Sequence, residues 1–371
     1  EGEGEGEGEG EGEGEGEGEG EGEGEGEGEG EGEGEGEGEG EGEGEGEGEG
    51  EGEGEGEGEG EGEGEGEGEG EGEGEGEGEG ECPDETPPYP IGHVGKTYYD
   101  PSRGNQAIST QIYYPAEYGG NDVPVAGPPC RAFPLVVFGH GYQTSISHYA
   151  YIWQSLAPQG YFVVMCDSHN ELVWDFSDFG LDLAFLIEAL QAEAVAPSSL
   201  FYGKITDTAA LMGHSMGGGA IMFGGKHSSR ATTIVGLAPS AVDSGVISAA
   251  AQVQATALVV AAGHDCIVNA DNHAVPIYEA IPSLCKYYAE IFDGSHCGFA
   301  ESPDACDLAQ TLLCPFADFI DEGHQRGIAV NLVLPWLDFT LKLRPEALGT
   351  FYDQLGVYAV SGAIAYTGSC N

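Results

Sequence analysis

The first 81 residues alternate strictly between glutamate and glycine, which confines the folded protein to the residues that follow. Glycine leaves the backbone very free, and like charges repel, so this tract has no apolar surface to bury. We predict a disordered low-complexity tail over 1–81, a proline-rich linker over 82–95 and a single folded domain over 96–371. Weak binding of cations by the tail is the alternative, but no glutamate is held in position to ligate an ion.

The folded part is acidic even without the tail. Setting aside 41 of the 69 acidic residues leaves 28 against 10 lysines and arginines, a net charge of −18. Such a surface repels phosphates, so we exclude nucleic acid as a partner. Apolar runs such as 255–262 are far shorter than the ~20 residues that cross a bilayer, so we predict no membrane span. Neutral or cationic substrates remain, and we expect a monomer.

The chain has nine cysteines, many for a reducing compartment, and none of them forms a Cys-x-x-Cys pair. We infer disulfide bonds and therefore a secreted or cell-surface protein. Because the number of cysteines is odd, at least one of them has no cysteine partner within the chain. Cys166 is the best candidate for a buried free thiol because it ends the apolar run 161–166.

Short apolar stretches alternate with segments of helical periodicity along the domain. This alternation predicts an α/β fold with a mostly parallel central sheet and helices on both faces. We expect strands at 108–114, 135–138, 161–165, 209–212, 232–237, 257–261 and 287–292, and helices at 147–157, 179–193 and 220–226.

The segment Gly213-His214-Ser215-Met216-Gly217 lies between an apolar stretch and a helix of small residues. It matches the Gly-x-Ser-x-Gly nucleophile elbow, in which a serine occupies a sharp turn from strand to helix. Glycines flank such a serine because the turn brings neighbouring backbones close together. The segment therefore predicts an α/β-hydrolase fold with Ser215 as nucleophile.

A serine hydroxyl is a poor nucleophile unless a base accepts its proton, and in this fold the acid and then the histidine follow the serine. Asp265 comes after the predicted strand at 257–261, and His296 comes after the one at 287–292. Each residue is then delivered to the site by the carboxyl end of a strand. We predict Asp265 as the acid and His296 as the general base.

Other residues near the predicted base and acid have similar chemistry. Asp293 is too close in sequence to the base to approach it from a separate strand, while Asp243 and His264 also follow strands. A zinc site built from His264, Asp265 and Cys266 is disfavoured because three adjacent residues do not easily surround one ion. We expect no metal and no cofactor.

The oxyanion formed by the attack needs two backbone donors, one of them from the residue after the nucleophile. Met216 is that residue. Tyr142, in the glycine-rich loop 138–142, is the candidate for the second donor. His140 in the same loop is interpreted as structural rather than as a second base.

Cys266 and Cys297 directly follow the predicted acid and base. A disulfide between them would join the two loops whose separation sets the geometry of the site. Cys306 and Cys314 would then close a second, local loop. These pairings are proposals, because connectivity does not follow from one sequence.

Several segments are familiar in combination: Gly141-Tyr142, 161–168, 213–219, Ala238-Pro239, Asp265, 274–278 and 294–297. Together they resemble the bacterial polyester hydrolases, which are cutinase-like and PET hydrolase-type enzymes within the dienelactone hydrolase and platelet-activating-factor acetylhydrolase group. The resemblance covers 96–299, with a weaker similarity near Trp336. It implies a lidless, solvent-open serine carboxylic ester hydrolase without a metal, acting through an acyl-enzyme on esters or polyesters. It also implies the triad and oxyanion donors given above and a disulfide between the acid and base loops.

The segment after Ala-Pro departs from that family. The polyester hydrolases usually carry an aromatic residue just before an Asp-Ser pair, whereas Ala241 and Val242 occupy those positions here. An aromatic polyester substrate is therefore less favoured than an ester in general. Tyr142, His214 and Val242 are our candidates for substrate binding, and Trp174 is a further candidate to line an apolar cleft.

Two segments, 301–335 and 348–371, have no counterpart in the resemblance. A rival interpretation is a non-catalytic surface-adhesion module on the same fold, but such proteins typically lose a triad member and none is missing here. A thioesterase or a peptidase also remains open, because a triad does not by itself choose between ester, thioester and amide.

Overall fold

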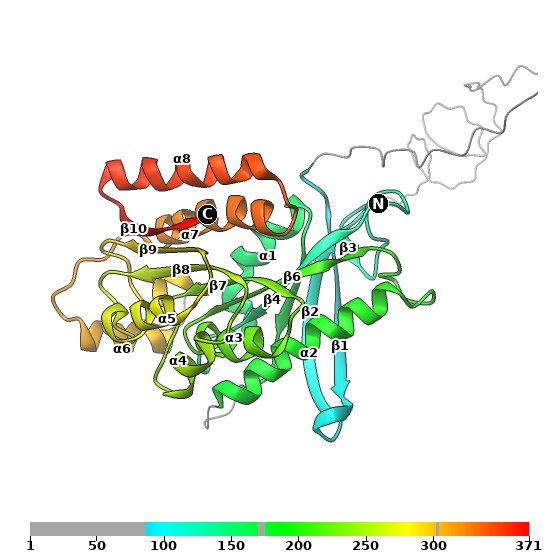
Figure 1. Ribbon diagram of the computed structural model, residues 1–371, viewed down its shortest axis with the longest axis horizontal. Helices are drawn as coiled ribbons and strands as arrows, with labels where there is room; N and C mark the ends of the chain where they lie inside the picture. Colours follow the sequence, from blue (N-terminus) through cyan, green and yellow to red (C-terminus); the bar gives the residue numbers. More distant parts are fainter. Residues whose placement is uncertain (1–86, 170–174, 302–303, 371) are drawn as a thin grey trace, which may run out of the picture. The chain divides into compact units, whose positions relative to one another are not determined.

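A ten-stranded sheet forms the centre of the domain, in the order β10-β9-β8-β7-β6-β4-β5-β2-β1-β3 (Figure 1). The computed structural model describes residues 87–169, 175–301 and 304–370. These residues belong to one compact unit that spans 79–371. The predicted tail, linker residues 82–86 and Trp174 lie outside the described residues.

The central strands of the sheet run parallel, and both ends of the sheet are antiparallel. The parallel strands are β4 (Phe133–Gly139), β5 (Phe162–Cys166), β6 (Ile205–His214), β7 (Ala231–Leu237), β8 (Thr256–Ala262) and β9 (Cys285–Ile291). The antiparallel strands are β1 (Ile91–Asp100) and β2 (Gln106–Pro115) at one end and β10 (Ile364–Cys370) at the other, while the short β3 (Gly120–Asn121) pairs with β1. The sheet is mostly parallel, as the sequence predicted.

Helices cover both faces of this sheet (Figure 1). One face packs against α2 (Phe176–Ala194), α3 (Met216–His227), α4 (Gly245–Ala250) and α5 (Ala274–Ala280). The other packs against α1 (Ala150–Leu156), α7 (Glu322–Thr340) and α8 (Pro345–Ser361). Successive residues of a strand point to opposite faces, so Leu135 and Val137 join the first core while Val136 and Phe138 join the second.

The remaining helices are short or lie in the segment that had no counterpart in the resemblance. α6 (Asp304–Leu313) and most of α7 fill the segment 301–335. Short 3₁₀ helices lie at Pro101–Arg103, Ile146–Tyr149, Ala157–Gln159, Ala270–Asn272 and Cys297–Phe299. On α7 the buried Trp336 donates its indole N–H to Thr233 Oγ1 at 2.9 Å, which fastens this helix to β7.

The sequence did not predict β10. Most of its side chains are exposed, so it lacks the apolar pattern by which buried strands are recognised. A disulfide between Cys285 and Cys370 joins it to β9. The carboxyl ends of β6, β8 and β9 lie along one edge of the sheet, and they lead into the segments that hold Ser215, Asp265 and His296.

Candidate active site

Ser215 lies at the turn between β6 and α3 with a left-handed backbone, φ 58° and ψ −115°. The glycines around Ser215 have no room for a Cβ atom. A Cβ on Gly213 would lie 2.6 Å from the carbonyl carbon of Gly217, and a Cβ on Gly217 would overlap the carbonyl oxygen of Gly139. The strained turn is therefore possible only with glycine at these positions.

The structure brings Ser215, His296 and Asp265 together in one hydrogen-bonded chain. His296 Nε2 lies 2.9 Å from Ser215 Oγ, and His296 Nδ1 lies 2.6 Å from Asp265 Oδ2. All three side chains are buried. An ionised carboxylate only accepts hydrogen bonds, so Nδ1 carries the proton and Nε2 presents its lone pair to the serine hydroxyl.

Backbone donors orient the carboxylate from its other side. Asp265 Oδ1 accepts hydrogen bonds from the N–H groups of Ile267 at 2.9 Å and Val268 at 2.6 Å. These two bonds fix the orientation of the carboxylate, so that its other oxygen faces His296. The loop after β8 thus fixes the acid through the turn that immediately follows it.

The competing residues have other partners. His264 Nδ1 lies 3.0 Å from the carbonyl of Asp318 and 3.7 Å from Asp293 Oδ1, and both His264 and Asp293 are exposed side chains. Asp243 accepts from Gly245 N at 2.7 Å at the start of α4. Of the candidate acids, Asp265 is the one whose carboxylate is bonded to His296 among the residues described.

The glycine-rich loop after β4 lies against the nucleophile elbow. His140 is fully buried, with its ring nitrogens 2.8 Å from the carbonyl of Gly141 and 2.7 Å from that of Ser168. Burial lowers the pKa of His140, so the ring is neutral and donates to one of the two carbonyls. The carbonyl of His140 in turn accepts from Gly217 N at 3.0 Å, which places this loop beside the first turn of α3.

Met216 begins α3, so its N–H belongs to the first turn, whose donors have no partner within a helix. The N–H of Gly141 is already used, because it donates to Tyr149 Oη at 2.9 Å. Tyr142, the next residue of the loop, remains our prediction for the second oxyanion donor. The positive end of the α3 dipole adds to the stabilisation of an anion here.

A buried chain of hydrogen bonds connects the loop after β4 to the base. Tyr149 Oη lies 2.9 Å from His214 Nδ1, and His214 Nε2 lies 3.1 Å from the carbonyl oxygen of His296. A carbonyl only accepts, so His214 donates from Nε2, and its Nδ1 accepts a hydrogen bond from the Tyr149 hydroxyl. Burial holds the pKa of His214 well below its usual range, so the ring stays neutral.

The predicted substrate-binding residues differ in exposure. His214 is 3% exposed and both of its ring nitrogens bond within the protein, so in this structure neither nitrogen is offered to a substrate. Val242 is 55% exposed in the segment after β7, and Tyr142 is partly buried. Substrate contact by these three residues stays a prediction.

The predicted disulfide pairing is wrong, although all four cysteines are in disulfides. Cys266 is bonded to Cys314, and Cys297 is bonded to Cys306, rather than Cys266 to Cys297. The physical reason is that α6 and the residue directly after it supply a partner for each loop, Cys306 for Cys297 and Cys314 for Cys266. Cys130 is also disulfide-bonded.

The prediction of a buried free thiol at Cys166 is confirmed. Burial raises the pKa of the Cys166 thiol to about 12. A thiol of that kind stays protonated at neutral pH and is a poor nucleophile. It is a core residue at the end of β5.

Two buried glutamines were missed by the sequence analysis. Gln310 Oε1 accepts from His296 N at 2.8 Å, and Gln325 Oε1 accepts from Ser295 N at 2.9 Å. Gln325 also donates to the carbonyl of Ser295 at 2.8 Å. A signal was present for Gln310, which is four residues from both Cys306 and Cys314 and so shares a helix face with them.

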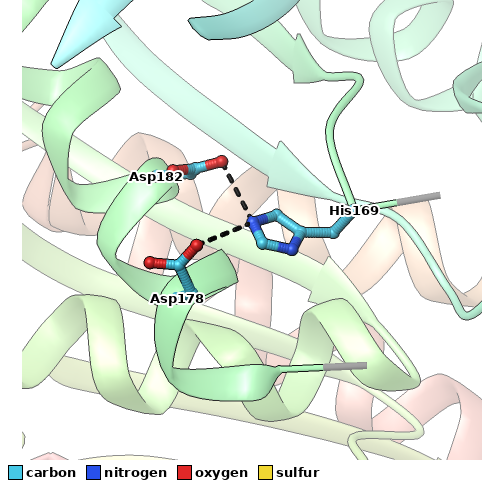
Figure 2. Close-up of side chains that lie close together, drawn as sticks. All are labelled: His169, Asp178 and Asp182. Atoms are coloured by element: carbon cyan, nitrogen blue, oxygen red, sulfur yellow. Dashed lines mark ion pairs between the residues drawn. The ribbon is translucent and has the colours of Figure 1, made fainter. Parts of the chain in front are cut away.

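Another cluster of titratable side chains joins the segment after β5 to the first turns of α2 (Figure 2). His169 Nε2 lies 3.2 Å from Asp182 Oδ2 and 3.6 Å from Asp178 Oδ2. The guanidinium of Arg103 lies 2.8 Å from Asp178 Oδ1 and 2.6 Å from Asp182 Oδ1. A bound cation would have to share these carboxylates with Arg103, so we interpret the cluster as an ion-pair network between the β1–β2 turn and α2.

A mostly parallel sheet with helices on both faces and a Ser-His-Asp chain at its carboxyl edge defines the α/β-hydrolase fold. The chain belongs to the PET hydrolase-like family, whose sequence model matches residues 84–327. That match runs through α6 into α7, beyond the point at which the resemblance in sequence ended.

The chain is also similar to a curated protein, the bis(hydroxyethyl) terephthalate hydrolase of Streptomyces coelicolor. The two are 26% identical over 212 residues, which cover 57% of this chain and 62% of that relative. Among the described residues, no helix is long and apolar enough to cross a membrane.

Proposed function

We propose that this protein is a serine carboxylic ester hydrolase that acts through an acyl-enzyme on Ser215. The observation that carries the proposal is the buried chain from Asp265 through His296 to Ser215, with distances of 2.6 and 2.9 Å. Family membership and similarity to a hydrolase of a terephthalate ester support the same chemistry.

In the first half-reaction, Ser215 Oγ attacks the ester carbonyl while His296 Nε2 takes the hydroxyl proton. The carbonyl oxygen becomes an oxyanion, which the N–H groups of Met216 and Tyr142 stabilise. His296 then returns the proton to the leaving alcohol, and the acyl group stays on Ser215. Asp265 keeps Nδ1 protonated and stabilises the imidazolium that forms.

In the second half-reaction, water takes the place of the alcohol. His296 Nε2 accepts a proton from the water as it attacks the acyl carbon, and the proton passes to Ser215 Oγ as the acid is released. The same oxyanion donors serve both steps. The cycle consumes one ester and one water and yields one acid and one alcohol.

The substrate that fits best is a neutral ester, including oligomeric or polymeric esters. The acidic surface repels anionic substrates, and Ala241 and Val242 leave an apolar surface without an aromatic ring in the segment after β7. Leu308 and Leu312 add exposed apolar surface on α6, at 62% and 70% exposure. Such residues favour adsorption to an apolar substrate phase.

Secretion as a monomer completes the proposal. Three disulfides with both partners among the described residues are consistent with an oxidising, extracellular setting. The single observation that bears on location is this disulfide content, since cytosolic thiols are kept reduced.

A fluorophosphonate probe tests the proposal directly, because it labels a serine only when that serine is activated. The wild-type protein should bind one probe and hydrolyse p-nitrophenyl acetate, and Ser215→Ala should lose both properties. His264→Ala is the matched control, since this exposed histidine lies next to the acid and is bonded to the carbonyl of Asp318 instead. Labelling that survives Ser215→Ala would reject Ser215 as the nucleophile.

A further inference from the structure

One face of α6 contacts both loops that complete the triad. Cys306, Gln310 and Cys314 are spaced four residues apart, and Cys314 continues the last turn by donating its N–H to the carbonyl of Gln310 at 2.7 Å. Cys306 is bonded to the cysteine that follows the base, and Cys314 to the cysteine that follows the acid. The helix is therefore covalently fastened at both ends to the site.

Between these two bonds, Gln310 contacts the backbone of the base itself. Its amide oxygen accepts the N–H of His296 at 2.8 Å and lies 3.4 Å from the N–H of Cys297. The side chain is 5% exposed, so water does not readily replace it. A buried N–H without an acceptor is unfavourable, so the loop would move if the Gln310 acceptor were removed.

The backbone carbonyl oxygen of His296 is hydrogen-bonded as well, to His214 Nε2 at 3.1 Å. Both polar backbone groups of His296 are thus bonded to side chains that belong to other elements. These two bonds fix the Cα–Cβ direction of the histidine, and with it the position of Nε2 relative to Ser215 Oγ.

We propose that Gln310 is a positioning residue for His296, and that the disulfides at both ends of α6 keep its amide in place. The inference rests on the proposed function, in which His296 is the base for Ser215. Gln310 touches neither the substrate nor the reacting atoms in this proposal. It acts on the rate through the placement of the imidazole.

The test compares Gln310→Met, Gln310→Glu and Gln191→Met with p-nitrophenyl acetate as substrate, at a temperature at which each variant is folded by circular dichroism. Methionine fills the space but removes the acceptor, so kcat should fall roughly 10- to 100-fold while KM stays within about two-fold. Glutamate keeps an acceptor oxygen and should recover kcat to within about three-fold of wild type.

Gln191→Met is the matched control for losing a buried amide. Gln191 is 8% exposed and donates to the carbonyls of Thr206 and Asp207, so its loss should lower the melting temperature and leave kcat unchanged. If Gln310→Met behaves like this control, with a lower melting temperature and a wild-type kcat, Gln310 only stabilises the fold and the proposal is wrong.

A second variant keeps the proposal testable should Gln310→Met not fold. Cys297→Ala with Cys306→Ala releases one end of α6 but leaves Gln310 present, so kcat should fall several-fold at 25 °C. Cys285→Ala with Cys370→Ala removes a disulfide between β9 and β10 and should leave kcat unchanged. Equal kcat in both double variants would overturn the role of α6. Full activity of Ser215→Ala would instead reject the proposed function, which is a separate outcome.

Discussion

Ser215 Oγ and His296 Nε2 lie 2.9 Å apart, yet the protein holds these two residues by different means. Within the described part of the chain, the backbone of Ser215 bonds to other backbone groups: its N–H donates to Leu237, and its carbonyl accepts from Gly219 and Ser240. The backbone of His296 bonds to the side chains of Gln310 and His214. The residue after His296, Cys297, is bonded to Cys306 by a disulfide.

The difference shows two ways to fix a reactive group. The elbow is fixed by close backbone packing, because a Cβ on Gly213 would meet Gly217 within the turn and a Cβ on Gly217 would meet Gly139 of β4. His296 is in the loop after β9, and its backbone N–H and carbonyl are bonded to side chains from α6 and β6. Its position depends on side chains that are distant in sequence, so single substitutions far from the triad should affect the base more than the nucleophile.

The largest effect on kcat should come from breaking the hydrogen bond between Asp265 and His296. Asp265→Asn removes the charge that holds Nδ1 protonated, so kcat should fall by roughly 10³- to 10⁴-fold with the fold intact. Asp293→Asn is the control, since this exposed carboxylate lies near His264 instead. Initial rates on p-nitrophenyl acetate measure both. If Asp265→Asn kept near-wild-type turnover and Asp293→Asn lost it, the assignment of Asp265 as the acid would be wrong.

The steric constraint on the elbow is tested by Gly217→Ala. The added methyl group would overlap the backbone carbonyl of Gly139, so we expect a loss of about 3 kcal/mol of unfolding free energy, together with activity. Gly349→Ala is the control, because this glycine of α8 has open space around it. It should stabilise the protein by up to ~1 kcal/mol. Chemical denaturation of both variants measures the contrast, and equal stabilities would contradict it.

The covalent support of the acid loop is tested by Cys266→Ser with Cys314→Ser. This disulfide closes a loop with a sequence separation of 48. The chain-entropy estimate for such a loop is about 4 kcal/mol, so the melting temperature should fall by several degrees. Activity should fall more steeply on heating than at 25 °C. A variant with an unchanged melting temperature would show that packing alone holds this loop.

The smallest effect concerns pH, through the buried His214. Its pKa is lowered in the folded state, so the unfolded chain, with a histidine pKa of about 6.5, takes up a proton that the folded protein does not. The contribution of His214 to the free energy of unfolding is therefore complete above pH 6.5. As the pH falls below 6.5 this contribution is lost, which lowers the free energy of unfolding by up to about 2 kcal/mol at pH 5. His214→Gln should flatten the dependence of unfolding free energy on pH between 7 and 5. An unchanged slope would mean that His214 does not titrate on unfolding.

Much of the fold was predictable because its central strands carry their own signal. The runs 135–138, 161–165 and 257–261 are apolar and short, and each became a buried parallel strand. β10 was not predictable in this way, because its exposed side chains form a strand only by pairing with β9. α6 was also missed, since the residues that attach it to the domain are Cys306, Gln310 and the following Cys314 instead of apolar residues.

The sequence by itself determined the turn from strand to helix around Ser215 and the free thiol of Cys166, and it predicted Asp265 and His296 as acid and base. Each of these follows from neighbours in the chain or from a single buried run. Only the tertiary structure decided that Cys266 bonds to Cys314 and Cys297 to Cys306, and that Gln310 binds the backbone of His296. The physical reason is that a disulfide or a side-chain hydrogen bond depends on the distance between atoms in space. Spacing along the chain does not set that distance once two loops and a helix have packed together.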